Sequence, residues 1–207
     1  MQHHGLIFDG RKNIDVNSKE RRYKKMLVLC GASGTGKDTL MKKLVEKYDY
    51  RRLVTYTTRP KREGEVNGID YHFVSSQTFH ELCAGDFFAE TTSYDVANGE
   101  VWEYGTAIKD IKDDVIVILN PHGLKELKKD KSLDIIAIHF FAPYGEIWNR
   151  LRKRGDHSDE AARRMEADKK DFEDINEYVD FAINTDGRYS IDEMADLINQ
   201  VYLLRKE

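Results

Sequence analysis

The chain of 207 residues contains only two cysteines, Cys30 and Cys83, and no hydrophobic run long enough to cross a membrane. The two thiols show no metal-ligand spacing, and we expect no structural disulfide between them. A membrane-spanning helix needs roughly 20 consecutive apolar residues, and the polar N-terminus lacks the apolar core of a secretion signal. These absences predict a soluble, cytoplasmic protein with no membrane partner.

A strong excess of either charge is also missing. Asp and Glu number 37 against 33 Lys and Arg, a formal net charge of −4, so we expect no nucleic acid partner. The basic stretch at residues 19–25 is interrupted by Glu20, and we interpret it as a solvated lead-in to the first strand. The length suits a single domain, which follows a polar, aperiodic arm at residues 1–25.

A glycine-rich stretch between an apolar and an amphipathic segment organises the chain. Residues 26–30 predict a strand and residues 40–45 a helix, and the segment between them has the spacing G-x-x-x-x-G-K of a phosphate-binding loop. Glycines let successive N–H groups face one anion, the helix start adds its positive dipole end, and the lysine reaches the terminal phosphates. We call residues 31–37 the glycine loop. The expected ATP contacts are Ala32, Ser33, Gly34, Thr35, Gly36, Lys37, Asp38 and Thr39.

The residue after the loop lysine departs from the usual pattern. A Ser or Thr hydroxyl normally holds Mg²⁺ at this position, but the chain has Asp38, followed by Thr39. A carboxylate is also a hard oxygen ligand suited to Mg²⁺, although it adds negative charge beside the triphosphate. Asp38 is therefore the candidate metal ligand, and Mg²⁺ the expected cofactor with ATP as co-substrate.

The rest of the chain alternates strand-like and helix-like segments. Strands are expected at residues 52–55, 114–119, 133–141 and 179–184. Helices are expected from Ser75 or Ser76 to about Ala84, from Pro121, up to Arg154, from Ser158, and at residues 191–204. Residues 86–106 suggest short strands with turns at Asp95 and at Asn98-Gly99. This alternation predicts an α/β fold with a parallel sheet covered on both faces.

Two arginines, Arg59 and Arg62, lie three residues apart in a segment rich in hydroxyl groups. Two guanidiniums and the phenol of Tyr71 make a good grip for a phosphate group. A surface arginine pair is the ordinary interpretation, but the threonines around this pair and the preceding glycine loop favour a phosphate site.

Residues 57–74, TTRPKREGEVNGIDYHFV, resemble the acceptor-binding signature of the guanylate kinase family, T-T-R-x-x-R-x-G-E-x-x-G-x-D-Y-x-F-V. The resemblance runs from about Met26 to the C-terminus. It implies a P-loop NTPase-type three-layer α/β fold with a parallel core sheet, built from residues 26–55, 107–150 and 170–207. It also implies an insertion that binds the nucleoside monophosphate, at about 56–106, and a short lid at about 151–169.

The same resemblance assigns roles to further residues. Arg59, Arg62, Tyr71 and Tyr104 would hold the phosphate of GMP. Glu90 would accept hydrogen bonds from guanine, since a carboxylate faces the donor edge of that base. Additional contacts to GMP are implied for Thr55, Thr106 and Asn120, and Asn184 falls in the loop on the adenine side.

The lid segment carries the arginines implied to clamp the transferring phosphoryl group. Arg150 and Arg154 lie four residues apart on one helical face, and together with Lys37 and Arg164 they form the expected catalytic set. The lid is one residue shorter than the common family pattern, so Arg163 is the alternative to Arg164. A solvated helix whose arginines pair with Glu160, Glu166 and Asp168 is the other interpretation.

A second departure from the family follows the strand at 114–119. The family usually has a D-x-D pattern there, but this chain has Ile118 and Asn120. One hypothesis is that Asp38 partly replaces the lost carboxylate. Both departures resemble the ribose 1,5-bisphosphate phosphokinases, which are similar to guanylate kinases in fold. Those enzymes often have G-K-D-[ST] in the phosphate-binding loop and an Asn after the corresponding strand.

The first interpretation is therefore an ATP-dependent nucleoside monophosphate kinase that converts GMP or dGMP to the diphosphate, as a monomer or homodimer. The alternatives are a kinase of ribose 1,5-bisphosphate or of another nucleoside monophosphate, and a non-catalytic guanylate-kinase-like interaction module. The intact glycine loop and lid arginines argue against the last.

Overall fold

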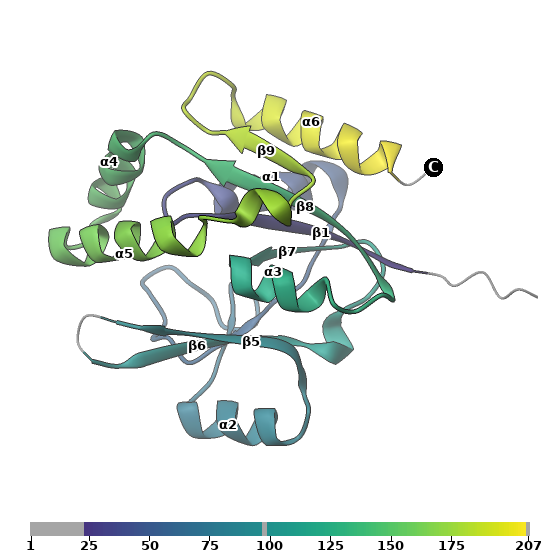
Figure 1. Ribbon diagram of the computed structural model, residues 1–207, viewed down its shortest axis with the longest axis vertical. Helices are drawn as coiled ribbons and strands as arrows, with labels where there is room; N and C mark the ends of the chain where they lie inside the picture. Colours follow the sequence, from purple (N-terminus) through teal and green to yellow (C-terminus); the bar gives the residue numbers. More distant parts are fainter. Residues whose placement is uncertain (1–22, 97–98, 206–207) are drawn as a thin grey trace, which may run out of the picture.

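The computed structural model describes residues 23–96 and 99–205, whose strands form two sheets (Figure 1). The larger sheet has the order β2-β7-β1-β8-β9, and all of its neighbouring strands are parallel. Its strands are β1 (Lys24–Gly31), β2 (Arg51–Arg52), β7 (Val115–Leu119), β8 (Leu133–Phe141) and β9 (Phe181–Asn184). The smaller sheet has the order β4-β3-β6-β5. Its strands are β3 (Tyr56–Thr57), β4 (His72–Phe73), β5 (Phe88–Asp95) and β6 (Val101–Ala107).

Helices cover both faces of the parallel sheet. The central strands are continuous apolar runs, as expected of strands buried on both sides. Leu27 and Leu29 of β1 pack with α1 (Lys37–Tyr48) and α6 (Ile191–Leu204), whereas Met26 and Val28 pack on the opposite face with α3 (Pro121–Leu127). The predicted three-layer α/β fold is therefore confirmed.

The smaller sheet carries α2 (Ser76–Ala84), which begins after Ser75. The side chain of Ser75 accepts a hydrogen bond from the Thr78 N–H, the usual way to satisfy a free donor at a helix start. The Phe79 ring stacks on Phe88 of β5 with 4.7 Å between centroids. A 3₁₀ turn, η1 (Ile108–Asp110), leads back to the core.

Two helices lie together beyond the carboxyl end of β8 (Figure 1). They are α4 (Tyr144–Arg154) and α5 (Ser158–Asp171), joined at Gly155 with φ 94°, and η2 (Ile175–Glu177) follows. Ile147 and Leu151 of α4 form a small apolar cluster with Ala161 and Met165 of α5. Within the described residues, no helix combines the length and apolarity needed to cross a membrane.

Some expected boundaries are wrong. The strand expected at 52–55 is confined to Arg51–Arg52, because the chain leaves β7 for the smaller sheet after Leu53, whose N–H still donates to the Ile116 carbonyl at 2.9 Å. The first strand starts at Lys24, two residues early, because β8 pairs with it there. The arm up to residue 22 and the turn at Asn98 lie outside the described residues. The division into core, insertion and lid stays a prediction.

Candidate active site

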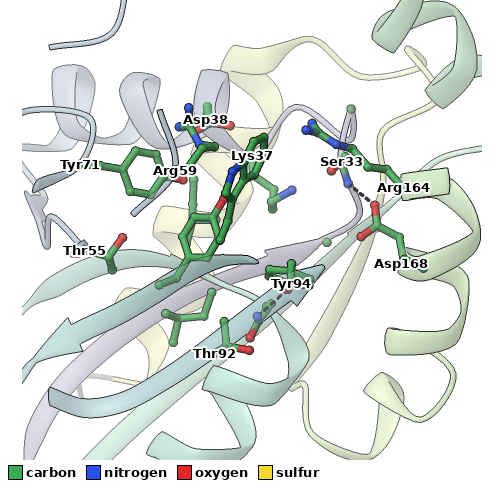
Figure 2. A pocket seen from close by; sticks show the side chains of 18 of the residues that line it. Ser33, Lys37, Asp38, Thr55, Arg59, Tyr71, Thr92, Tyr94, Arg164 and Asp168 are labelled. Atoms are coloured by element: carbon green, nitrogen blue, oxygen red, sulfur yellow. Dashed lines mark hydrogen bonds between the residues drawn. The ribbon is translucent and has the colours of Figure 1, made fainter. Parts of the chain in front are cut away.

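One cavity of about 520 Å³ is lined by the glycine loop, the smaller sheet, the end of β7, and helices α4 and α5 (Figure 2). It brings together most of the predicted site residues. These are Ser33, Gly34, Gly36, Lys37, Asp38, Thr39, Thr55, Arg59, Arg62, Tyr71, Glu90, Tyr104, Asn120, Arg150, Arg154 and Arg164. Four predicted residues are not part of the lining, namely Ala32, Thr35, Thr106 and Asn184.

The glycine loop lies between β1 and α1 at the carboxyl edge of the parallel sheet. Gly36 has φ 87°, and an added Cβ there would meet nothing within 4 Å, so its backbone conformation is the reason for glycine. Lys37 Nζ donates to the Ala32 carbonyl at 2.9 Å, which holds the ammonium over its own loop. Burial lowers the pKa of Lys37. A phosphate group near this ammonium would offset the cost of burying its charge.

The first arginine of the acceptor signature is held rigidly. Arg59 is only 4% exposed, and its two terminal nitrogens donate to the two carboxylate oxygens of Glu65 at 2.9 and 2.8 Å. Its guanidinium carbon lies 5.2 Å from the Tyr71 ring centroid. Glu65 also accepts from the Arg62 N–H at 2.7 Å. Sequence reasoning missed this role of Glu65, although the residue lies within the signature.

Arginines from the acceptor segment and from the lid converge in the cavity. Burial, followed by the charges of Arg59, Arg154 and Arg164, lowers the pKa of Arg62. Guanidiniums that line one cavity and act on one another favour an added anion, so this arrangement suits a phosphate-bearing ligand.

The lid arginines also have carboxylate partners, one of which, Glu160, is among the three that the alternative interpretation named. Arg163 and Arg164 both donate to Glu160, and they lower the pKa of Glu160 to about 2. Arg154 pairs with Asp156. Both Arg163 and Arg164 line the cavity, but Arg163 also donates to the Asp95 carbonyl at 2.9 Å. Arg164 is one of the charges that act on Arg62, which favours it as the clamp.

Arg150 connects two loops at the edge of the sheet. It donates to the Gly34 carbonyl at 3.3 Å and to the Thr185 hydroxyl at 3.2 Å. Asn184 donates to Asp186 at 3.1 Å in the same loop after β9. Arg150 therefore fixes the glycine loop against the segment expected on the adenine side.

Glu90 of β5 also lines the cavity and is 7% exposed. The Thr106 hydroxyl donates to Glu90 Oε1 at 2.5 Å, so Thr106 contributes from behind the cavity wall. A Cβ on Gly123 would lie 2.7 Å from Glu90 Oε2, which explains why α3 has a glycine there. Burial raises the pKa of Glu90 to about 7, and the Thr106 hydrogen bond opposes this rise.

The raised pKa of Glu90 predicts a pH-dependent cost to stability. Between the ordinary pKa of 4.5 and the folded value of about 7, the folded protein binds more protons than the unfolded chain, so stability falls as the pH rises. We expect Glu90→Gln to gain about 2 kcal/mol in unfolding free energy relative to the unsubstituted protein between pH 5 and pH 8. Urea unfolding at both pH values measures this difference, and a constant difference would contradict it.

Asn120 uses both of its polar side-chain groups within the protein. Its carbonyl oxygen accepts from the Gly123 N–H at 2.7 Å and thereby caps α3. Its amide nitrogen donates to the Tyr94 hydroxyl at 2.5 Å (Figure 2). The side chain lines the cavity, and its contact with GMP stays a prediction. Sequence reasoning missed Tyr94, which also lines the cavity, because no motif singles it out.

Removal of the Asn120 side chain should destabilise the protein through α3. Asn120→Ala leaves the Gly123 N–H without its acceptor, and we expect a loss of about 1–2 kcal/mol in the free energy of unfolding. Asn120→Asp keeps an acceptor at the helix start and should lose less. Chemical denaturation of both variants tests this, and equal losses would refute the capping role.

The carboxylate of Asp38 and the hydroxyl of Thr39 are the hard oxygen donors beside Lys37. The described residues contain no group of three or more His, Cys, Asp or Glu side chains able to hold a metal ion. This donor set nevertheless fits Mg²⁺, which is usually bound through one or two carboxylates, phosphate oxygens and water. The charge of Asp38 also contributes, after burial, to raising the pKa of Tyr71, so Asp38 faces the acceptor segment.

Comparisons with known proteins point to one family. The guanylate kinase family model matches residues 23–201. A guanylate kinase of Nitratidesulfovibrio vulgaris is 35% identical over 179 residues, 82% of this chain and 83% of the relative. A guanylate kinase of Nostoc sp. is 33% identical, and the match covers 78% of this chain and 83% of the relative. A guanylate kinase of Syntrophotalea carbinolica is 28% identical, and the match covers 84% of each chain.

A solved structure resembles the fold. The crystal structure of guanylate kinase from Anaplasma phagocytophilum superposes with a TM-score of 0.63 at 23% identity, and the match covers 89% of this chain and 87% of the other. At that identity the likeness concerns the fold alone. With the family model matching most of its length, the chain belongs to the guanylate kinase family.

Proposed function

We propose that this protein transfers the γ-phosphoryl group of ATP to GMP or dGMP, giving ADP and the corresponding diphosphate. One observation carries the proposal. A single cavity is lined by the glycine loop, by Arg59 and Arg62, and by the buried carboxylate of Glu90. A donor triphosphate and an acceptor nucleotide with a hydrogen-bond-donating base therefore have complementary groups in one cavity.

The proposed reaction proceeds by positioning and charge. Arg59, Arg62, Tyr71 and Tyr104 hold the acceptor phosphate, one oxygen of which attacks the γ-phosphorus. The new P–O bond forms as the bond to the β-phosphate oxygen breaks and ADP leaves. Charge on the transferring group and on the leaving oxygen is stabilised by Lys37, Arg154 and Arg164, which is how phosphoryl transfer is generally catalysed.

Specificity for guanine is proposed to come from Glu90. The ionised carboxylate accepts hydrogen bonds from the donor groups on the base edge, while the Thr106 hydroxyl keeps the carboxylate oriented. Adenine presents a different pattern of donors and acceptors, so its monophosphate would leave the buried carboxylate unsatisfied.

Mg²⁺ is proposed to accompany ATP, bound with help from Asp38 and Thr39. When bound, it supplies positive charge that neutralises the phosphate oxygens. Asp38→Ser should raise the KM for MgATP and the Mg²⁺ concentration needed for half-maximal rate about tenfold, the scale of one contact to a charged group. Steady-state rates over a magnesium titration measure this. Faster turnover in the variant would exclude Asp38 as a metal ligand and the hypothesis that it replaces the carboxylate lost at Asn120.

The second candidate is ribose 1,5-bisphosphate phosphorylation. The observation that favours it is Asn120, which lines the cavity where the family usually has an aspartate and whose side chain is already bonded to Gly123 and Tyr94. ADP formation from MgATP should be measured with GMP, dGMP, AMP, UMP, dTMP and ribose 1,5-bisphosphate. Preference for guanine nucleotides supports the proposal. Activity with the sugar phosphate alone overturns it, and no turnover despite ATP binding favours an interaction module.

A kinase of GMP acts in purine nucleotide metabolism, and we place this role in the cytoplasm. The oligomeric state, monomer or homodimer, and the absence of a nucleic acid partner stay predictions from the sequence.

A further inference from the structure

The lid helix α5 places a carboxylate on the glycine loop. The Ser33 N–H donates to Asp168 Oδ2 at 2.7 Å across a separation of 135 residues in sequence (Figure 2). Ser33 is the third residue of the glycine loop, whose N–H groups are the donors that such loops offer to phosphate oxygens. The Asp168 carboxylate therefore occupies a donor of the predicted phosphate cradle.

Asp168 lies in the cavity where the ATP phosphates are expected, and not in an ion pair on the protein surface. Asp168 lines the same cavity as Lys37 and Arg164. Burial raises the pKa of the Asp168 carboxyl, and the Ser33 N–H and the charge of Lys37 oppose this rise. The carboxylate thus uses the same loop donor and the same lysine charge that would serve a triphosphate.

The position of α5 is set by packing, so the contact belongs to the arrangement of the lid. Ala161 and Met165 of α5 pack on Ile147 and Leu151 of α4. Asp168 follows Met165 by three residues, about one helical turn, and it follows Arg164 by four, so it projects from the same side of the helix as that arginine. The lid helix therefore presents the positive Arg163 and Arg164 and the negative Asp168 to the same cavity.

We propose that Asp168 competes with the phosphates of ATP for the glycine loop, so that ATP binding displaces the Asp168 carboxylate and shifts the lid helix. The Ser33 N–H is a single donor and cannot be given fully to both groups. A carboxylate left in place would also lie close to the negative triphosphate. Arg164 lies on the same helix, so it would reach the transferring phosphoryl group only after the Asp168 carboxylate has left the Ser33 N–H. The inference rests on the ATP-binding half of the proposed function.

Nucleotide affinity of the full chain tests the proposal by isothermal titration calorimetry. Asp168→Asn removes the charge but keeps a group that can accept from Ser33, and Asp168→Ala removes both. We expect ATP and inorganic tripolyphosphate to bind about tenfold more tightly to both variants, the scale of one contact to a charged group. The affinity for GMP should stay within about twofold, because its phosphate is assigned to Arg59 and Arg62. Glu166→Gln, at an exposed carboxylate of the same helix outside the cavity lining, is the matched control and should leave ATP affinity unchanged.

Three outcomes overturn the proposal. Unchanged ATP affinity in both Asp168 variants shows that the carboxylate does not compete. Weaker ATP binding to Asp168→Ala, with Asp168→Asn unaffected, shows that Asp168 only supports the shape of the loop. Weaker binding that appears only in the presence of Mg²⁺ shows that Asp168 holds the metal instead. Failure to bind GMP in every variant refutes the proposed acceptor, but it leaves the ATP comparison intact.

Discussion

Replacing Lys37 with methionine should reduce the rate of diphosphate formation from ATP and GMP by about a thousandfold. Methionine keeps the length and apolar stem of the side chain but removes the charge that faces the triphosphate. Within residues 23–96 and 99–205 this ammonium donates to two neutral groups, the Ala32 carbonyl at 2.9 Å and the Thr35 hydroxyl at 3.4 Å. Because neither partner carries a charge, the ammonium can still attract phosphate oxygens, and its loss should lower kcat more than it raises the KM for GMP.

Steady-state kinetics with varied ATP and GMP measures the effect, and Lys42→Met is the control. Lys42 is an exposed lysine of the same helix and is not part of the cavity lining. Because the Lys37 ammonium is buried and burial lowers its pKa, the variant should be no less stable than the unsubstituted protein. A loss of less than about tenfold in kcat would contradict a direct role of Lys37 at the transferring phosphoryl group.

The second large effect is expected at Glu90. Glu90→Gln should lower kcat/KM for GMP by about a thousandfold, because the amide nitrogen would face donors of the base and leave buried groups unpaired. The low activity with AMP should change far less, so the variant loses specificity as well as rate. Glu126→Gln is the matched control, because Glu126 lies on α3, pairs with Lys129 beyond the end of that helix, and acts on Glu90 through its charge.

The pH dependence gives a second measurement of the same role. Since the pKa of Glu90 is raised to about 7 by burial, the carboxylate is protonated in a large share of molecules below that pH. The KM for GMP should fall as the pH rises from 6 to 8, and this dependence should vanish in Glu90→Gln. An unchanged ratio of GMP to AMP activity in the variant would show that Glu90 does not read the base.

The glycine loop and the acceptor arginines were predictable because each is a short pattern whose chemistry depends on neighbouring residues. The strand, loop and helix around Lys37 follow from local periodicity and from glycines at positive φ. The Arg59 to Tyr71 segment likewise forms a local unit, in which Glu65 binds Arg59 six residues away. The smaller sheet, by contrast, includes β3 and β4, strands of two residues each, which are too short for a periodic pattern to fix their bounds.

The contacts that escaped prediction join distant parts of the chain. Asn120 meets Tyr94 across 26 residues, and Asp168 meets Ser33 across 135. Each depends on how α3 and α5 pack against the sheets and the glycine loop. The sequence places Asp168 on a highly charged helix, where a pairing with the lid arginines was the natural alternative. Only the packing of α5 on α4 turns that carboxylate toward the glycine loop.

The most direct test of the account follows the γ-phosphoryl group itself. ATP labelled at the γ-position with phosphorus-32 should be incubated with the protein, Mg²⁺ and GMP, and the products separated by thin-layer chromatography. We expect the label in GDP, with little free phosphate, and much less label transferred when AMP replaces GMP. Label found only as inorganic phosphate, or transferred equally well to both monophosphates, would contradict the account.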